Sequence, residues 1–211
     1  MRTYRSRTAD PTKILTRHEL TTVLVDVKRK AKRSKNTRLN LVLFRLAACC
    51  GLRASEIAHL QVGDVRVDVP RSHLRIRASA AKGRRPRTVP LWWDAGTLAD
   101  VAAWKTERLR LKARPTHPFL VSLRPGRKPI PFSRHTLRKR FRTACKVLGP
   151  QRLETLTIHH GRHTFLSHAL AGGRTLAEVR DAAGHSNITI TSGYLHMVVD
   201  DDEVGNLFRY D

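Results

Sequence analysis

The chain has 211 residues, enough for one substantial domain, and 40% of them are hydrophobic, which supports a real core. It carries 41 lysines and arginines against 17 acidic residues, a formal net charge of +24. Such an excess predicts a polyanionic partner, most commonly nucleic acid, although a merely solvated basic surface has the same composition. The three cysteines form no Cys-x-x-Cys pair, which excludes a disulfide framework, and no apolar run reaches the ~18 residues of a membrane span. We therefore expect a protein of the cytoplasm, associated with the nucleoid.

The first 13 residues are polar and basic without hydrophobic periodicity, and they are predicted to form a flexible arm, 1–13. Thr16 and Glu19 then make a capping box that starts the first helix. The far end of this helix is basic and includes Lys28 and Lys32. Two interpretations weigh evenly: a solvated cationic helix end favoured by the helix dipole, or contact with the DNA backbone.

A second helix is predicted over residues 37–50, and Gly51 ends it. The segment G-L-R-A-S-E-I follows, so that Arg53 stands just after a glycine turn, at the start of another helix. From there its guanidinium either projects into a groove or only pairs with Glu56.

Residues 65–69, 74–77 and 87–91 alternate as three short strands. The turn before the last strand is strongly basic, and its side chains are candidates for phosphate contact: Lys82, Arg84, Arg85 and Arg87.

The next predicted helix begins at Asp94 and runs to about residue 112, and a proline-rich stretch, 113–131, follows it. Ser133 then caps a helix that extends to residue 148, with Leu137 and Phe141 in its buried stripe. The opposite face of this helix is predicted to lie along DNA through Arg134, Arg138, Lys139, Arg142 and Lys146.

The segment H-H-G-R-H starts a helix near the C-terminus, and His159 and Arg162 share one face of it. A further helix ends at Gly184, which delivers His185 at a helix terminus, and Tyr194 follows nine residues later. A phenol is a poor nucleophile at its usual pKa of about 10. Tyr194 would therefore need a neighbouring base and an electrophile that cations already polarise.

A metal site is not expected in this segment, although His159 and His163 lie four residues apart on a helix. The zinc-protease pattern requires H-E-x-x-H, whereas Gly161 and Arg162 stand between these histidines, and an arginine beside a dication is unfavourable. We predict no cofactor. The other histidines of this helix are expected to be structural or to face DNA: His160, His163 and His168.

The pattern H-x-x-R-H-T-F, followed by G-H-S-x-I-x-x-T-x-x-Y-x-H, resembles the C-terminal signature of the tyrosine recombinase (phage integrase) family, and residues 51–64 resemble its first catalytic box. The resemblance implies an α+β fold, a mainly helical catalytic domain of the DNA breaking-rejoining type with a small antiparallel β-sheet or hairpin. We expect this domain over 14–198 and a tail, 199–211, that docks on a neighbouring protomer. The family's N-terminal core-binding domain has no counterpart here, so we expect a compact recombinase or a fragment.

The resemblance also implies a catalytic set for phosphodiester transfer: Arg53, Lys82, His159, Arg162, His185 and Tyr194. The two arginines would hold the phosphate through paired hydrogen bonds. Lys82 would protonate the leaving 5′ oxygen, His159 would accept the Tyr194 proton, and His185 would bond a non-bridging oxygen. The product would be a 3′-phosphotyrosine, whose ester stores the energy for rejoining.

These features predict a site-specific recombinase that acts on double-stranded DNA as a homotetramer, with an accessory DNA-bending protein as a further candidate partner. A type IB topoisomerase and a non-catalytic DNA-binding protein of the same fold are the alternatives. The chain departs from the family pattern at Gly161 and Ala183, where leucine is usual, and at Gly193 before the tyrosine. The first two departures are expected to thin the core behind the site, and the third to loosen the backbone of the nucleophile.

Overall fold

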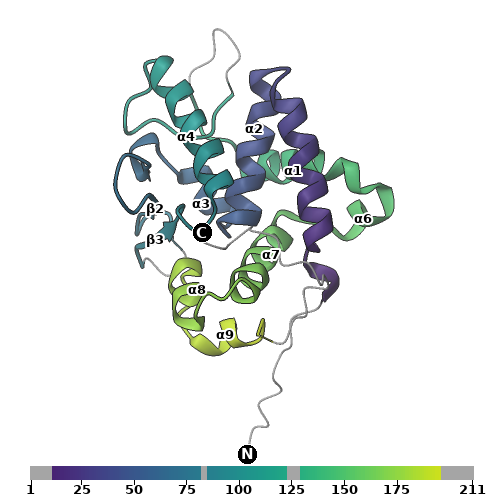
Figure 1. Cartoon of the computed structure of the whole chain (residues 1–211). Helices are drawn as coiled ribbons and strands as arrows, with labels where there is room; N and C mark the ends of the chain where they lie inside the picture. The colour runs from purple at the N-terminus through teal and green to yellow at the C-terminus, as the bar shows by residue number, and fades with distance from the viewer. Residues whose placement is uncertain (1–10, 82–84, 123–128, 196–211) are drawn as a thin grey trace, which may run out of the picture.

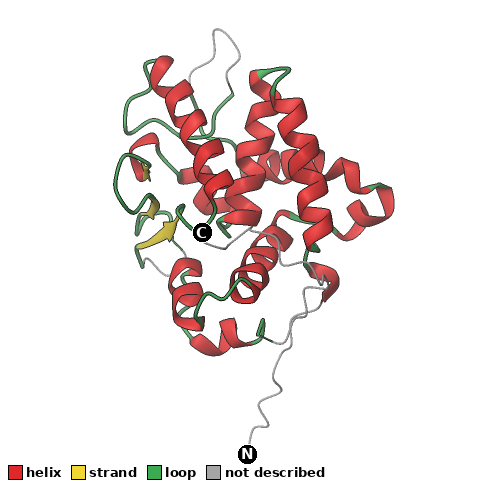
Figure 2. Cartoon of the chain, viewed as in Figure 1, coloured by secondary structure: helices red, strands yellow, loops and turns green. Residues whose placement is uncertain are grey.

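The computed structural model describes residues 11–81, 85–122 and 129–195, and most of these residues are helical (Figure 2). Its α-helices, in chain order, are α1 (Arg17–Ala31), α2 (Lys35–Phe44), α3 (Ala54–His59), α4 (Ala95–Arg110), α5 (Arg134–Ala144), α6 (Pro150–Thr155), α7 (Ile158–Ala171), α8 (Leu176–Ala183) and α9 (Ile188–Ser192). The predicted tail lies outside the described residues, as does the predicted arm except for Pro11–Lys13, a short 3-10 helix, η1.

The predicted helix starts are confirmed, because each proposed cap accepts a hydrogen bond from a backbone N–H in the first turn of its helix. These caps are Thr16, Asp94 and Ser133. Each helix therefore begins where the local sequence alone places it.

Three antiparallel strands, β1 (Val65–Arg66), β2 (His73–Ile76) and β3 (Arg87–Pro90), lie side by side in chain order. Leu74 pairs with Val65 on one side and Val89 on the other, and all three side chains are fully buried on one face of the sheet. With the helices, this small sheet confirms the predicted α+β class. Lys82 and Arg84, in the connection between β2 and β3, are outside the described residues.

The hydrophobic core has two parts. The larger one lies among α1, α2, α4 and α5, where Phe44 stacks on Phe141 with ring centroids 5.7 Å apart. The smaller one lies among α7, α8 and α9, where Trp93 stacks on Phe165 at 6.1 Å and Tyr194 joins the same cluster. The ring of the predicted nucleophile is therefore a packed core side chain as well as a reactive group.

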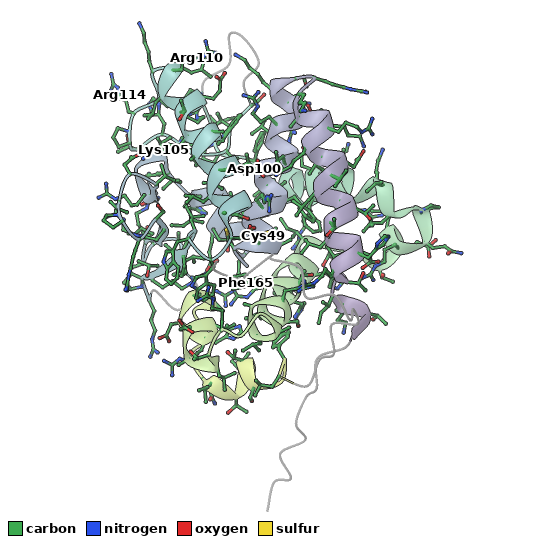
Figure 3. The ribbon with its side chains drawn as sticks, viewed as in Figure 1. Cys49, Asp100, Lys105, Arg110, Arg114 and Phe165 are labelled. Atoms are coloured by element: carbon green, nitrogen blue, oxygen red, sulfur yellow. The ribbon has the colours of Figure 1, made fainter. Side chains whose placement is uncertain are left out.

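Helix α2 changes its winding before it reaches the first catalytic box. It continues into a π-helical turn, η2 (Arg45–Cys49), in place of the uniform helix predicted over residues 37–50. The buried Arg45 guanidinium donates to Asp100 at 2.8 Å and to Asp94 at 3.0 Å, near Cys49 (Figure 3). Because a buried cation is tolerated only with such partners, these bonds fix the turn that leads into Gly51 and Arg53.

Helix α7 packs directly against this π-helical turn. A Cβ atom added at Gly161 would lie 3.0 Å from the carbonyl carbon of Ala47 and 3.1 Å from its oxygen. The expectation that Gly161 thins the core is therefore wrong. The glycine allows the two backbones to approach each other, and this contact sets the position of α7, which lies between α2 and the α8–α9 pair in Figure 1.

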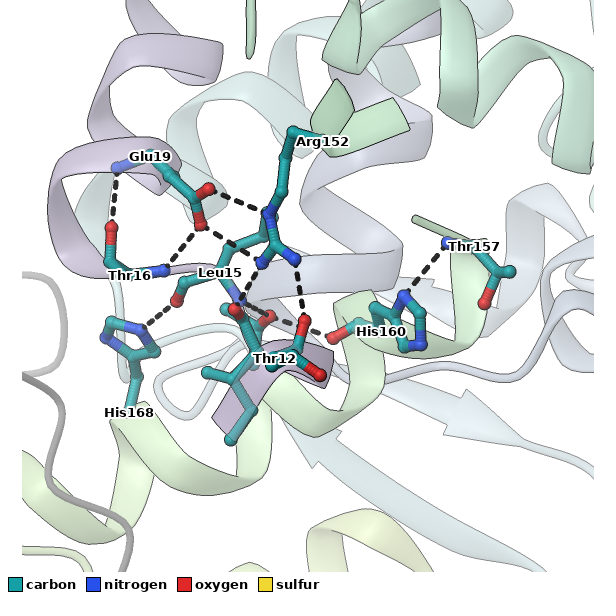
Figure 4. Close-up of polar contacts among 10 residues, drawn as sticks. Thr12, Leu15, Thr16, Glu19, Arg152, Thr157, His160 and His168 are labelled. Atoms are coloured by element: carbon teal, nitrogen blue, oxygen red, sulfur yellow. Dashed lines mark hydrogen bonds and ion pairs between the residues drawn. The ribbon is translucent and has the colours of Figure 1, made fainter. Parts of the chain in front are cut away.

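The chain segment before α1 is fastened to α7 and α6 (Figure 4). The Leu15 N–H donates to Thr164 Oγ1 at 2.9 Å, and His168 Nε2 donates to the Leu15 carbonyl at 2.8 Å. Arg152 of α6 donates to Glu19 at 2.8 Å and to the carbonyl oxygens of Thr12 and Ile14 at 2.6 Å each. Residues 12–19 are therefore held against both α6 and α7.

Arg87 was predicted to contact DNA, but the structure directs its guanidinium into the protein. Nη1 and Nη2 donate to the two carboxylate oxygens of Glu56 at 2.8 and 2.9 Å, and Nε donates to the Ala182 carbonyl at 2.8 Å. Its side chain is 8% exposed, and the partner carboxylate is fully buried. Arg87 therefore joins β3 to α3 and α8. These bonds make it a structural residue in place of the DNA contact that was predicted.

Replacing Gly161 with leucine should destabilise the fold, because the new side chain would have to displace the backbone of Ala47. Overpacking costs about 1–3 kcal/mol and exceeds the ~1 kcal/mol that helix propensity returns. We expect Gly161→Leu to lower Tm by several degrees in a calorimetric scan. The control Ala171→Leu, at an exposed position of the same helix, should leave Tm within about 2 °C. An unchanged Tm in Gly161→Leu would contradict the close approach.

Replacing Arg87 with alanine should cost about 3 kcal/mol of unfolding free energy, because it leaves the buried Glu56 carboxylate short of a partner. Arg85→Ala, at an exposed residue on the same side of the hairpin, should change the unfolding free energy by less than about 0.5 kcal/mol. Chemical denaturation measures both values. Similar small losses in the two variants would mean that Arg87 is not structural.

Candidate active site

Arg53 stands immediately before α3. Its side chain pairs with Glu56 and also lines a groove. Its Nη1 donates to Glu56 Oε1 at 2.9 Å and its backbone N–H donates to Oε2 at 2.8 Å, while the side chain stays 21% exposed. Burial alone would raise the pKa of Glu56, but hydrogen bonds and charge from Arg87 and Arg53 outweigh it and lower the pKa. Glu56 is therefore an ionised support that orients Arg53 without covering it.

Arg162 is the most deeply buried of the predicted catalytic cations. It is 2% exposed, and it donates to the Gly51 carbonyl at 2.7 Å and to the Ala183 carbonyl at 2.5 Å. Burial, and then the neighbouring charge of Arg53, lower its pKa to about 9. The guanidinium is still charged at neutral pH, and an anion such as a phosphate beside it would relieve the electrostatic cost.

His185 follows Gly184, whose left-handed conformation (φ +66°) ends α8. The Nδ1 atom of His185 is hydrogen-bonded to Thr191 Oγ1 at 2.9 Å, which fixes the ring against α9. Burial first, and then the charges of Arg162 and Arg53, lower the pKa of His185 to about 3. His185 is therefore a neutral imidazole at physiological pH.

Tyr194 lies three residues after Thr191 and is 8% exposed. Its hydroxyl is hydrogen-bonded to Nδ1 of His163, and the two rings stack with centroids 5.6 Å apart. Burial raises the pKa of this phenol, and the charge of Arg162 offsets part of that rise. His159, the predicted proton acceptor, instead lies edge-on against His163, with ring centroids 4.8 Å apart.

A groove of about 620 Å³ lies beside Arg53 and His159, and predicted catalytic and basic side chains line it. Arg53 and His159 form one part of its wall. Arg134, Arg138 and Arg142, spaced four residues apart along α5, form another part. Because this spacing places all three on one face of the helix, the groove joins the predicted site to a row of cations of the kind that binds a phosphate backbone.

The other predicted DNA contacts lie at exposed positions that do not line this groove: Lys28, Lys32, Arg85, Lys139 and Lys146. Lys28 lies 3.8 Å from Asp100. Among residues 11–81, 85–122 and 129–195, no cluster of three or more His, Cys, Asp or Glu side chains could hold a metal ion. None of the helices in that part of the chain is both long and apolar enough to cross a membrane.

Two residues next to the predicted site, His163 and Thr191, were not predicted from the sequence to contact Tyr194 or His185. His163 lies four residues after His159, so helical spacing alone could have placed the two imidazoles together. Thr191 is fully buried and bonds His185. No sequence signal distinguishes it from the other threonines nearby, since its role follows from the packing of α9.

Comparisons with known proteins identify the family of the chain. The model of the phage integrase family matches residues 13–200. The tyrosine recombinase XerC of Neisseria gonorrhoeae is 31% identical over 166 residues, which cover 79% of this chain and 49% of the relative. The XerC of Corynebacterium efficiens is 28% identical over 160 residues, covering 76% and 47%.

Solved structures share the fold. The XerA recombinase has a TM-score of 0.67 at 21% identity, over 87% of this chain and 60% of its own. The XerH recombinase bound to its difH substrate before cleavage has a TM-score of 0.67 at 23% identity, over 87% and 50%. A lambda integrase dimer bound to a core site has a TM-score of 0.61 at 18% identity, over 91% and 62%.

The chain spans about half the length of the curated relatives that it matches. The matched region includes Arg53, Arg162, His185 and Tyr194, which lie in separate segments and which the fold brings to one site. The chain therefore belongs to the phage integrase family.

Proposed function

We propose that this chain is the catalytic part of a site-specific recombinase that cleaves and rejoins double-stranded DNA through a 3′-phosphotyrosine. The observation that carries the proposal is the convergence of two arginines, Arg53 and Arg162, and a near-buried tyrosine, Tyr194, with Arg53 also lining a groove rich in cations. XerH and lambda integrase, which share the fold, were solved on DNA.

The reaction follows from the chemistry of these groups. The scissile phosphate would sit between the guanidinium groups of Arg53 and Arg162, which give hydrogen bonds and keep their charge as negative charge spreads over the non-bridging oxygens. The neutral imidazole of His185 would donate another hydrogen bond to those oxygens. The Tyr194 oxygen would attack phosphorus as the 5′ oxygen leaves with a proton, for which Lys82 is the candidate donor. No cofactor is needed, because the phosphotyrosine ester stores the energy for rejoining.

The assembly is proposed on the same basis. We place the catalytic domain over residues 14–198 and expect four copies on paired DNA sites, with the tail, 199–211, docked on a neighbouring copy. An accessory DNA-bending protein is a further candidate partner. A protein with these substrates would work in the cytoplasm, on the nucleoid.

Tyr194→Phe should abolish covalent protein–DNA adducts, because it removes the attacking oxygen and no positive charge. Nicked suicide duplexes that trap the adduct, resolved by denaturing electrophoresis, measure the effect, and DNA affinity should stay nearly unchanged. An adduct that survives in Tyr194→Phe would move the nucleophile elsewhere. Strand exchange between two sites separates a recombinase from a type IB topoisomerase, which would relax supercoils without exchange.

Arg138→Ala should weaken DNA binding about equally for all sequences, because a groove cation contacts phosphate rather than bases. The slope of log K against log salt concentration should become shallower by about 0.9, the value for one phosphate contact. Arg114→Ala is the control, since Arg114 is exposed beyond α4, far from Phe165 at the site (Figure 3). Equal salt slopes in both variants would remove the groove from the DNA interface.

A further inference from the structure

We propose that His163, rather than His159, accepts the proton of Tyr194 when its oxygen attacks the phosphate. This inference rests on the proposed function. It assigns the removal of the Tyr194 proton to His163, for which the sequence predicted no chemical role. It begins from contact with the reacting atom: the Tyr194 hydroxyl is hydrogen-bonded to His163 Nδ1, and the two rings stack with an interplanar angle of 26°.

The other imidazoles at the site are engaged elsewhere. His159 is exposed, lines the groove beside Arg53, and touches His163 with the ring planes at 82°. This position suits contact with the phosphate. His185 holds Thr191 through Nδ1. A proton acceptor must lie within hydrogen-bond reach of the proton that it takes, and His163 meets this condition before DNA arrives.

The surroundings of His163 keep it neutral, which an acceptor must be. Burial first, and then nearby positive charge, lower its pKa to about 4. The titratable and charged groups around His163 come from several elements. Lys13 lies in η1, His185 lies between α8 and α9, and Tyr194 follows α9. The others belong to α7 itself: His159, His160 and Arg162. In a neutral imidazole whose Nδ1 accepts the phenol proton, Nε2 carries the ring hydrogen.

The binding of DNA changes this balance in the direction that the reaction needs. The site has an excess of cations, because Arg162 and Lys13 lie near the imidazole and Arg53 lies near Arg162. A phosphodiester brings a negative charge to the same place, which favours an imidazolium on His163. The basicity of His163 would therefore rise when substrate is bound and the proton has to move.

The step balances. As the Tyr194 oxygen forms its bond to phosphorus, its proton passes to His163 Nδ1. The electron pair of the phosphorus–O5′ bond goes to the 5′ oxygen, which takes a proton from a separate acid, the role proposed for Lys82. Rejoining reverses each transfer: the 5′ hydroxyl attacks, and the tyrosine oxygen leaves with the proton that His163 held.

The test compares His163→Asn with His159→Asn in single-turnover cleavage of a nicked suicide duplex. Asparagine keeps a hydrogen-bond acceptor near the Nδ1 position but cannot take up a proton. We expect His163→Asn to slow cleavage about 100-fold to 10,000-fold, the usual contribution of a general base, with DNA affinity unchanged. The matched variant His159→Asn, one turn away on the same helix, should lose less.

A more acidic nucleophile separates proton transfer from positioning. A fluorinated tyrosine at position 194 ionises at lower pH and needs no acceptor, so it should restore most of the cleavage rate to His163→Asn. The same rescue should appear in that variant with ordinary Tyr194 as the pH rises towards the pKa of the phenol. If His163 only positions the ring, neither change will restore the rate.

A variant that does not fold is replaced by 2-fluorohistidine at position 163, which keeps the imidazole shape with far weaker basicity and should also slow cleavage. The inference would be overturned if His163→Asn or the 2-fluorohistidine protein cleaved at the wild-type rate. It would also be overturned if His163→Asn were slow and the fluorinated tyrosine did not restore its rate. Failure of the proposed function looks different, because the unmodified protein would then form no adduct at all.

Discussion

The buried carboxylate of Glu56 is the interaction on which the site depends. It binds Arg53, which stands just before its own helix, and Arg87 on β3, and Arg87 in turn holds the Ala182 carbonyl at the end of α8. Three segments far apart in the chain, α3, β3 and α8, are therefore joined through the ion pair of Glu56 and Arg87. The single negative charge does not neutralise the cations around it, since Arg162 lies close enough for Arg53 to lower its pKa. This imbalance is what a bound phosphate would correct.

Helix α7 carries His159, Arg162 and His163, and its position results from close backbone contact. Gly161 lets it lie against Ala47 of η2, whose winding the buried Arg45 and its two aspartates hold. The same helix holds the segment before α1 through Thr164. The start of α1 and the helix that bears Arg162 are therefore joined directly by hydrogen bonds.

The basic residues divide into two groups that composition cannot separate. Arg45 and Arg87 are buried and bonded to carboxylates, and they stabilise the fold. Arg134 and Arg138 line the groove, where their charges face solvent. The total of 41 lysines and arginines therefore overstates the cations available to a polyanion, because some of them are paired with carboxylates inside the protein, and the formal net charge of +24 already counts such pairs as neutral.

The sequence by itself determined the starts of α1, α4 and α5, the presence of three short strands, the order of the predicted catalytic residues and the family, because caps, strand alternation and motif spacing are local properties of the chain. Tertiary structure alone decided that Arg87 points inward, that Gly161 admits a neighbouring backbone, and that Tyr194 bonds His163 and not His159. Each of these depends on which atoms from distant segments come within a few ångströms. The residue types permit either outcome, and only packing selects one.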